Sequence, residues 1–107
     1  MNDISTEERT KLVATLNDLH RRTQPFMLTR GVVELGRLDE ITRLLREFDT
    51  FNEDNDPHGE HDFGSFEFGG KTLFWKFDYY DQSLGRWEDP LSPDCRRVLT
   101  VCLSEEY

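Results

Sequence analysis

The chain has 107 residues, 36% of them hydrophobic and 12% aromatic, and a formal net charge of −9 from 22 Asp and Glu residues against 13 Lys and Arg residues. This length fits a single domain, residues 1–107, with enough apolar side chains for one core. Because nucleic acid and anionic lipid carry charge of the same sign as the chain, the composition argues against both as main partners and favours a protein with a basic surface.

The first predicted element is an amphipathic helix that ends near Thr23. Ser5 and Glu8 have the spacing of a capping box, in which two side chains close the N-terminus of a helix. Behind this cap, apolar residues recur at helical spacing at Leu12, Val13, Leu16 and Leu19. Pro25 has no backbone N–H to continue the helix, so it sets the end of this element.

An extended segment and a second helix are predicted next. The short, β-branched stretches Phe26–Thr29 and Gly31–Leu35 favour a strand with an irregularity at Gly31. The helix after them is indicated by one stripe of a 3.6-residue period, which holds Leu38, Ile41, Leu44, Leu45, Phe48 and Phe51. If well buried, these side chains contribute about 1.5–3 kcal/mol each, more than helix propensity does.

The C-terminal half is predicted to form a sheet. Ser65–Phe68 alternates with period two, Gly69 and Gly70 supply the positive φ angles of a hairpin turn, and Lys71–Tyr80 continues as a strand. The side chains of this strand expected to meet the helices are Leu73, Trp75, Phe77 and Tyr79. Val98–Leu103 alternates again as a last strand. This order predicts an α+β fold, with two helices packed on one face of an antiparallel sheet of three or four strands.

The chain is expected to act in the cytoplasm. Its two cysteines, Cys95 and Cys102, indicate reduced thiols rather than a disulfide framework. The start Met1–Ser5 lacks the basic and apolar regions of a secretory leader. No apolar run approaches the roughly 20 residues that span a bilayer, so neither export nor membrane insertion is expected.

Several segments together carry a family resemblance: Asn55–Gly64 (NDPHGEHDFG), Trp75–Asp81 (WKFDYYD), Arg97–Thr100 (RVLT) and Glu105–Tyr107 (EEY). They resemble Domain of Unknown Function 3768, a family of short bacterial proteins. Two further segments look similar to the same family, Leu16–Leu19 and Thr29–Val32. The resemblance implies a bacterial protein carried on plasmids or integrative elements, and it implies no particular activity, cofactor or fold.

The segment Asn55–Gly64 also holds the candidate metal site. His58 and His61 lie three residues apart, and carboxylates surround them at Asp56, Glu60 and Asp62. Imidazole with carboxylate is a ligand set that suits zinc, manganese or iron. In this interpretation the metal ligands are His58, His61 and Asp62, with Asp56, Asp78 or Asp81 as further ligand candidates. Catalysis would use His58, Glu60, His61 and Asp62 around a metal-bound water. The histidine spacing matches no established metal motif.

The same segment also permits a structural interpretation. Asn55 and Asp56 would cap the loop by side-chain to backbone hydrogen bonds, Gly59 would take a left-handed turn, and His61 or Asp62 would anchor the following strand. A comparable structural role is predicted for Asp78, because an Asp within a strand needs a partner. The candidate partners for an ion pair with Asp78 are Lys76, Arg96 and Arg97.

A third interpretation is a contact surface. Between Asn52 and Pro90 the sequence holds ten acidic residues against Lys71, Lys76 and Arg86. Such an acidic span attracts a basic partner, and exposed aromatic residues anchor protein interfaces. The predicted binding residues are Asp56, Glu60, Asp62, Asp78, Tyr80, Asp81 and Trp87.

These observations favour a small, acidic, non-enzymatic protein-binding module that needs no cofactor. The predicted partner is a basic nucleic-acid-binding protein, and the resemblance adds a role as an accessory or anti-defence factor of a mobile element. The alternative is a metal-dependent hydrolase or nuclease centred on His58, Glu60, His61 and Asp62. The absence of a P-loop, a dinucleotide fingerprint and a nucleophile elbow from the sequence favours the binding module.

Overall fold

Within residues 4–107, which the computed structural model describes, four strands form one sheet in the order β1-β4-β3-β2. In chain order the elements are α1 (Thr6–Thr23), β1 (Met27–Leu28), α2 (Arg30–Glu34), α3 (Leu38–Arg46), β2 (Phe63–Phe68), β3 (Lys71–Tyr80), β4 (Arg96–Leu103) and the 3₁₀ turn η1 (Ser104–Glu106). β3 is antiparallel to both of its neighbours, whereas β1 is parallel to β4. The α+β class is confirmed.

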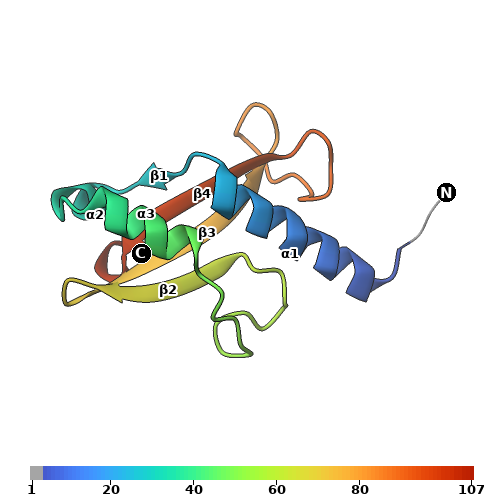
Figure 1. Cartoon of the computed structure of the whole chain (residues 1–107). Coiled ribbons are helices and arrows are strands. Elements are labelled where there is room, and N and C mark those ends of the chain that lie inside the picture. The colour runs from blue at the N-terminus through green and yellow to red at the C-terminus, as the bar shows by residue number, and fades with distance from the viewer. Residues whose placement is uncertain (1–3) are drawn as a thin grey trace.

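The prediction of a purely antiparallel sheet was wrong, because the sheet is mixed. The parallel pair joins Met27 to Thr100 and Leu28 to Val101. Alternation of apolar residues shows which way side chains point but not the direction in which a strand runs. That direction depends on where the chain enters the sheet, and β1 enters beside β4 after α1 has crossed the molecule (Figure 1).

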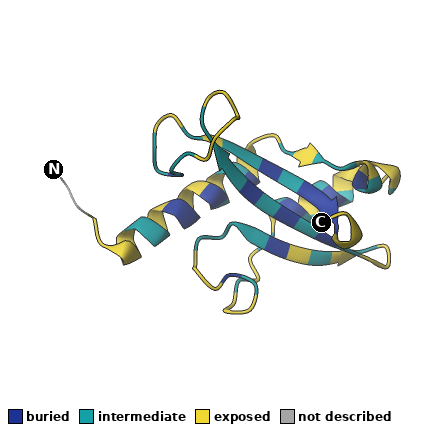
Figure 2. Cartoon of the chain, turned by 180° about the vertical axis from the view of Figure 1, so that it is seen from behind, coloured by how far each residue is buried: buried dark blue, intermediate teal, exposed yellow. Residues whose placement is uncertain are grey.

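The core lies between the sheet and the helices. In Figure 1, α1 and α3 are drawn in front of the strands, and in the reverse view of Figure 2 the strands are in front. The buried cluster pairs residues across β3 and β4 in register: Leu73 with Leu103, Trp75 with Val101, and Phe77 with Leu99. Val32, Ile41 and Leu45 add to it from the helices. The inward face predicted for β3 is therefore confirmed at Leu73, Trp75 and Phe77, and Tyr79 packs against the cluster as a partly buried residue.

The hairpin of β2 and β3 was predicted correctly. Gly69 and Gly70 form its turn with φ angles of 60° and 79°. Gly64 is needed for a different reason, because a Cβ at that position would lie 2.5 Å from Nε1 of Trp75. The last strand begins at Arg96, two residues before the predicted start.

α1 has the predicted N-terminal cap but not the predicted inward face. The backbone N–H of Glu8 donates to Oγ of Ser5 at 3.1 Å. Of the predicted apolar residues only Val13 is buried, while Leu12, Leu16 and Leu19 are exposed. The buried residues are Val13, Ala14, Asn17 and Arg21. The helix crosses an end of the sheet where loop carbonyl groups need donors, and polar side chains supply them.

The second predicted extended stretch, Gly31–Leu35, was wrong. Residues Arg30–Glu34 form the short helix α2 instead. A carboxylate from the far end of the chain explains this: Glu106 accepts hydrogen bonds from Oγ1 of Thr29 at 2.6 Å and from the N–H groups of Gly31 at 2.9 Å and Leu103 at 2.8 Å. The contact of Glu106 with the first turn of α2 joins residues too distant in the sequence for a local pattern to reveal.

α3 is shorter than predicted. It ends at Arg46, and Phe48 and Phe51 lie in the loop after it. Both rings still pack on Trp75, with centroids 5.3 Å and 6.1 Å from the Trp75 ring. Within the described part of the chain, every helix falls short of the length and apolarity that a bilayer-crossing segment requires.

Candidate functional site

The loop between α3 and β2 is built by its own side chains. Oδ1 of Asn52 accepts from the N–H groups of Asp54 at 2.9 Å and Asn55 at 3.1 Å, and Oδ1 of Asn55 accepts from the N–H of Asn52 at 3.0 Å. Gly59 has a left-handed φ of 72°. These contacts agree with the structural interpretation of this segment, in which short polar side chains and a glycine fix the turn.

His61 anchors this loop to α1. Its Nδ1 lies 3.0 Å from Oδ1 of Asp18, and its Nε2 lies 3.7 Å from Oδ2 of Asp56. Its backbone N–H donates to Oδ1 of Asp56 at 3.1 Å, and its φ of 54° is left-handed. The two carboxylates approach opposite ring nitrogens, so they do not converge on one point as metal ligands would.

The structure does not bring the two histidines of the loop together as a ligand set. His58 is exposed, whereas His61 is partly buried against Phe51. Among residues 4–107, no three His, Cys, Asp or Glu side chains are grouped closely enough to hold a metal ion. The arrangement of His58, Glu60, His61 and Asp62 therefore provides no observation in favour of metal-assisted chemistry.

A buried arginine, which the sequence reading missed, joins α1 to the end of α3. Arg21 is fully buried, and its guanidinium donates to the carbonyl oxygens of Leu45 at 3.1 Å and Phe48 at 2.8 Å. It also pairs with Asp18 at 2.9 Å and lies 5.0 Å above the ring of Trp75. Every face of this cation is therefore occupied, as burial of a charge requires.

Asn17 extends the network to the sheet. Its Nδ2 donates to the carbonyl oxygen of Glu60 at 3.0 Å and to the hydroxyl oxygen of Tyr79 at 2.8 Å. Its Oδ1 accepts from Nε of Arg97 at 2.7 Å. Burial raises the pKa of Tyr79 to about 12. The one sequence signal for this network is the spacing of Asn17 and Arg21, which places both polar residues on one helix face.

The predicted binding residues come from the loop before β2, the second half of β3 and the turn that follows β3. The N–H of Phe77 donates to the carbonyl oxygen of Asp62 at 2.9 Å, which places Asp62 beside the second half of β3. Tyr80 forms an antiparallel bridge with Trp87. We call this region the acidic end, and it comprises Asp56, Glu60, Asp62, Asp78, Tyr80, Asp81 and Trp87.

Three of these carboxylates have structural partners within the chain. Asp78 pairs with Nζ of Lys76 at 2.8 Å and not with Arg96 or Arg97, because the residue opposite it in the register is Val98. Oδ1 of Asp81 accepts from Oγ of Ser83 at 2.6 Å and from two backbone N–H groups of its turn, and these bonds lower the pKa of Asp81. Asp56 holds the backbone of His61 as described above.

Glu60 and Asp62 differ from these three. Neither carboxylate has a hydrogen bond or an ion pair with another residue among 4–107, although both are partly buried. Burial is the main cause that raises the pKa of each group above its usual value. Repulsion from Asp62 adds to the rise for Glu60, and repulsion from Asp56 adds to the rise for Asp62, while His58 acts in the opposite direction on both. The acidic end therefore contains two partly buried carboxylates that form no ion pair with any residue among 4–107.

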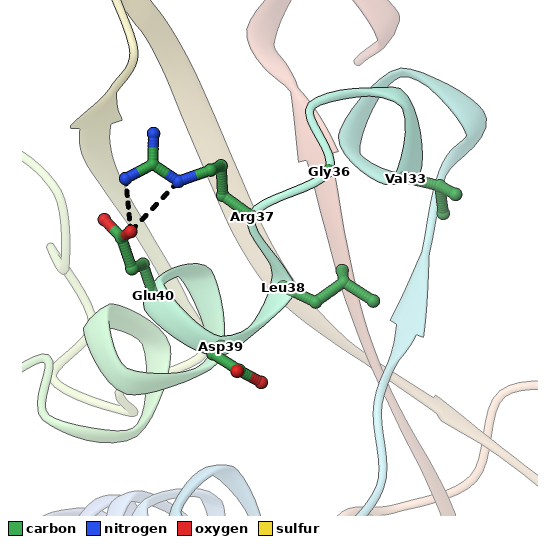
Figure 3. Close-up of a pocket in the computed structure, with 6 residues that line it drawn as sticks. All are labelled: Val33, Gly36, Arg37, Leu38, Asp39 and Glu40. Carbon is green, nitrogen blue, oxygen red and sulfur yellow. Dashed lines mark hydrogen bonds and ion pairs between the residues drawn. The ribbon is translucent and has the colours of Figure 1, made fainter.

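An open hollow of about 390 Å³ lies elsewhere, between α2 and α3 (Figure 3). Its lining residues are Val33, Gly36, Arg37, Leu38, Asp39 and Glu40. Arg37 and Glu40 form an ion pair with each other, so neither charge is free for a ligand. No predicted site residue lines this hollow.

A family profile described as "Protein of unknown function (DUF3768)" matches residues 28–106. The chain belongs to this family. The DUF3768 match runs from β1 to η1, so it contains the sheet and the acidic end but leaves out α1 and the segment Leu16–Leu19. No curated protein and no solved structure matches the chain.

Proposed function

We propose that the protein is a non-enzymatic protein-binding module whose acidic end contacts a basic surface on a partner protein. The observation that carries this proposal is the pair Glu60 and Asp62, two partly buried carboxylates that form no ion pair or hydrogen bond with another residue among 4–107. A Lys or Arg side chain from a partner would remove the repulsion between them and would gain charge-assisted hydrogen bonds.

The aromatic residues of the acidic end support the same role. Trp87 is 69% exposed, and it lies next to Tyr80 through their backbone bridge. Trp and Tyr are the residues that most often supply binding energy at protein interfaces, because each buries a large rigid surface. The turn that carries Trp87 is fixed by the hydrogen bonds of Asp81, so little conformational entropy is lost when a partner binds.

The charge of the whole chain indicates the kind of partner. A net charge of −9 accelerates the encounter with a basic protein and disfavours direct contact with nucleic acid. The proposed partner is therefore a nucleic-acid-binding protein whose basic surface the acidic end occupies. Within this proposal the protein acts in the cytoplasm as an accessory or anti-defence factor of a mobile element. Two free cysteines and the family resemblance described above support these parts.

The test is affinity capture from a bacterial lysate at low ionic strength, with elution at high salt and identification by mass spectrometry. We expect the wild-type protein to retain proteins of high isoelectric point. The double variant Glu60→Gln/Asp62→Asn should lose them, because it removes the two carboxylates without a partner.

The matched control is Glu53→Gln/Asp54→Asn, which removes the same charge from exposed positions of the same loop. This control should retain the partners, because it keeps Glu60 and Asp62 while its net charge equals that of the double variant. Equal retention by both variants would show that overall charge, and not the acidic end, causes capture. A variant Trp87→Ala tests the aromatic anchor separately and should weaken retention at every salt concentration.

A further inference from the structure

The outer side of α1 carries an apolar stripe without a partner, which we define as Leu12, Leu16 and Leu19. Their exposed fractions are 47%, 38% and 58%. Spacings of four and three residues place them on one helix face, opposite the face that buries Ala14, Asn17 and Arg21. Within residues 4–107 no element covers this leucine stripe, and in Figure 1 the N-terminal half of α1 extends past the strands.

The charges along α1 indicate what covers the stripe. Its first turn carries the acidic residues Glu7 and Glu8, and its last turn carries His20, Arg21 and Arg22. Arg21 is used inside the protein, whereas Arg22 is exposed and has no ion pair with a residue that the structure describes. A helix with an acidic start and a basic end is complementary to another copy of itself that runs in the opposite direction.

We propose that a second copy of this chain docks on the leucine stripe, with the two α1 helices antiparallel across a two-fold axis near Leu16. In this arrangement Leu12 of each copy meets Leu19 of the other, because the two residues lie about equally far from Leu16. Glu8 of each copy then lies beside Arg22 of the other. Both the apolar and the charged contacts occur twice, as a closed two-fold interface requires.

The expected dimer is weak, because the leucine stripe spans only about two turns of helix. It does not depend on the proposed binding of a basic partner, since the leucine stripe and the acidic end are different surfaces. If both occur, one dimer presents two acidic ends, and a partner with two basic patches gains from bivalent contact.

The first experiment is sedimentation velocity of the purified protein over a range of concentrations. We expect the average mass to rise from monomer towards dimer, and Leu16→Glu to remain monomeric throughout. Leu84→Glu is the matched control, because Leu84 is exposed to a similar degree outside α1. A wild-type protein that stays monomeric, or a Leu16→Glu variant that still associates, overturns the proposal. Since Leu16 is partly in solvent, circular dichroism should show a native fold for both variants.

The second experiment tests the antiparallel arrangement. Glu8→Arg and Arg22→Glu should each weaken the homodimer about tenfold, because like charges then face each other at both ends. An equimolar mixture of the two single variants should restore association, since both charge pairs are complementary in the mixed dimer. A mixture no more dimeric than the separate variants overturns the antiparallel arrangement. Circular dichroism of each variant verifies that α1 is intact, because Glu8 also belongs to the N-terminal cap.

Discussion

The rings of Phe51 and His61 lie face to face, with centroids 3.7 Å apart and planes 1° from parallel. This stack holds the imidazole from the side that Asp18 and Asp56 leave open. We predict that Phe51→Leu lowers the free energy of unfolding by about 1 kcal/mol, because leucine keeps apolar volume but loses the flat contact. Urea unfolding measures this change, and Trp87→Leu at an exposed position is the control. The stacked Phe51 ring should also shift the NMR signals of the His61 ring protons upfield. Persistence of that shift in the Phe51→Leu variant would contradict the face-to-face contact.

Arg21 is the residue whose loss should destabilise the protein most. Arg21→Met keeps the length and packing of the side chain but leaves the carbonyl groups of Leu45 and Phe48 without their donor. We expect a loss of about 3 kcal/mol in the free energy of unfolding, the usual effect of breaking a buried charge network. The control is Arg22→Met at the neighbouring exposed position, expected to change stability by less than about 0.5 kcal/mol. If Arg21→Met lowered the free energy of unfolding as little as Arg22→Met does, the buried contacts of Arg21 would contribute no stability.

Glu60 should destabilise the free protein at neutral pH. Its pKa is raised in the folded protein, so folding is most favoured when the carboxyl group is protonated. As the pH rises from below the ordinary value of 4.5 through the raised value, the unfolded state ionises first and stability falls. We therefore predict that Glu60→Gln stabilises the protein at pH 7 by at most about 0.5 kcal/mol, since the group is partly solvated.

The gain from Glu60→Gln should disappear at acid pH, where both proteins carry an uncharged side chain at this position. Thermal unfolding of both proteins between acid and neutral pH measures it. Glu53→Gln, an exposed position in the same loop, controls for the general loss of negative charge. A gain that persists below the ordinary pKa of a glutamate would show that charge is not its cause.

Tyr79 should ionise late in an alkaline titration. Burial raises its pKa from 10.0 to about 12, so the folded protein favours the neutral phenol and stability falls as the pH rises from the first value towards the second. The ultraviolet absorbance of tyrosinate should include one component that appears near the higher value. That component should be absent from Tyr79→Phe, and its presence in the variant would assign the late transition to another tyrosine.

The sequence predicts best those elements whose causes are local. The β2–β3 hairpin follows from alternation and two glycines, and the cap of α1 follows from Ser5 and Glu8. The structural interpretation of the segment Asn55–Gly64 also agrees with the structure, because Asn55, Asp56 and Gly59 fix the turn through nearby backbone groups.

The features that the sequence does not predict depend on distant partners. The leucines of α1 have the spacing of a core face, yet Asn17 and Arg21 occupy the interior because loop carbonyl groups there require donors. Likewise, the sequence lists the acidic residues without showing which ones have partners. Register and loop geometry assign Asp78 to Lys76 and leave Glu60 and Asp62 without an ion-pair partner among the described residues.

Glu106 fastens α2 from 75 residues further along the chain. The same carboxylate reaches Thr29, so the segment of the family match begins and ends at one place in space. A segment whose two ends meet in this way tolerates a change in the order of its elements better than a loss of its last turn. Removal of η1 would leave the start of α2 without its acceptor, and a fusion partner is better attached through a spacer that follows Tyr107 than in place of these residues.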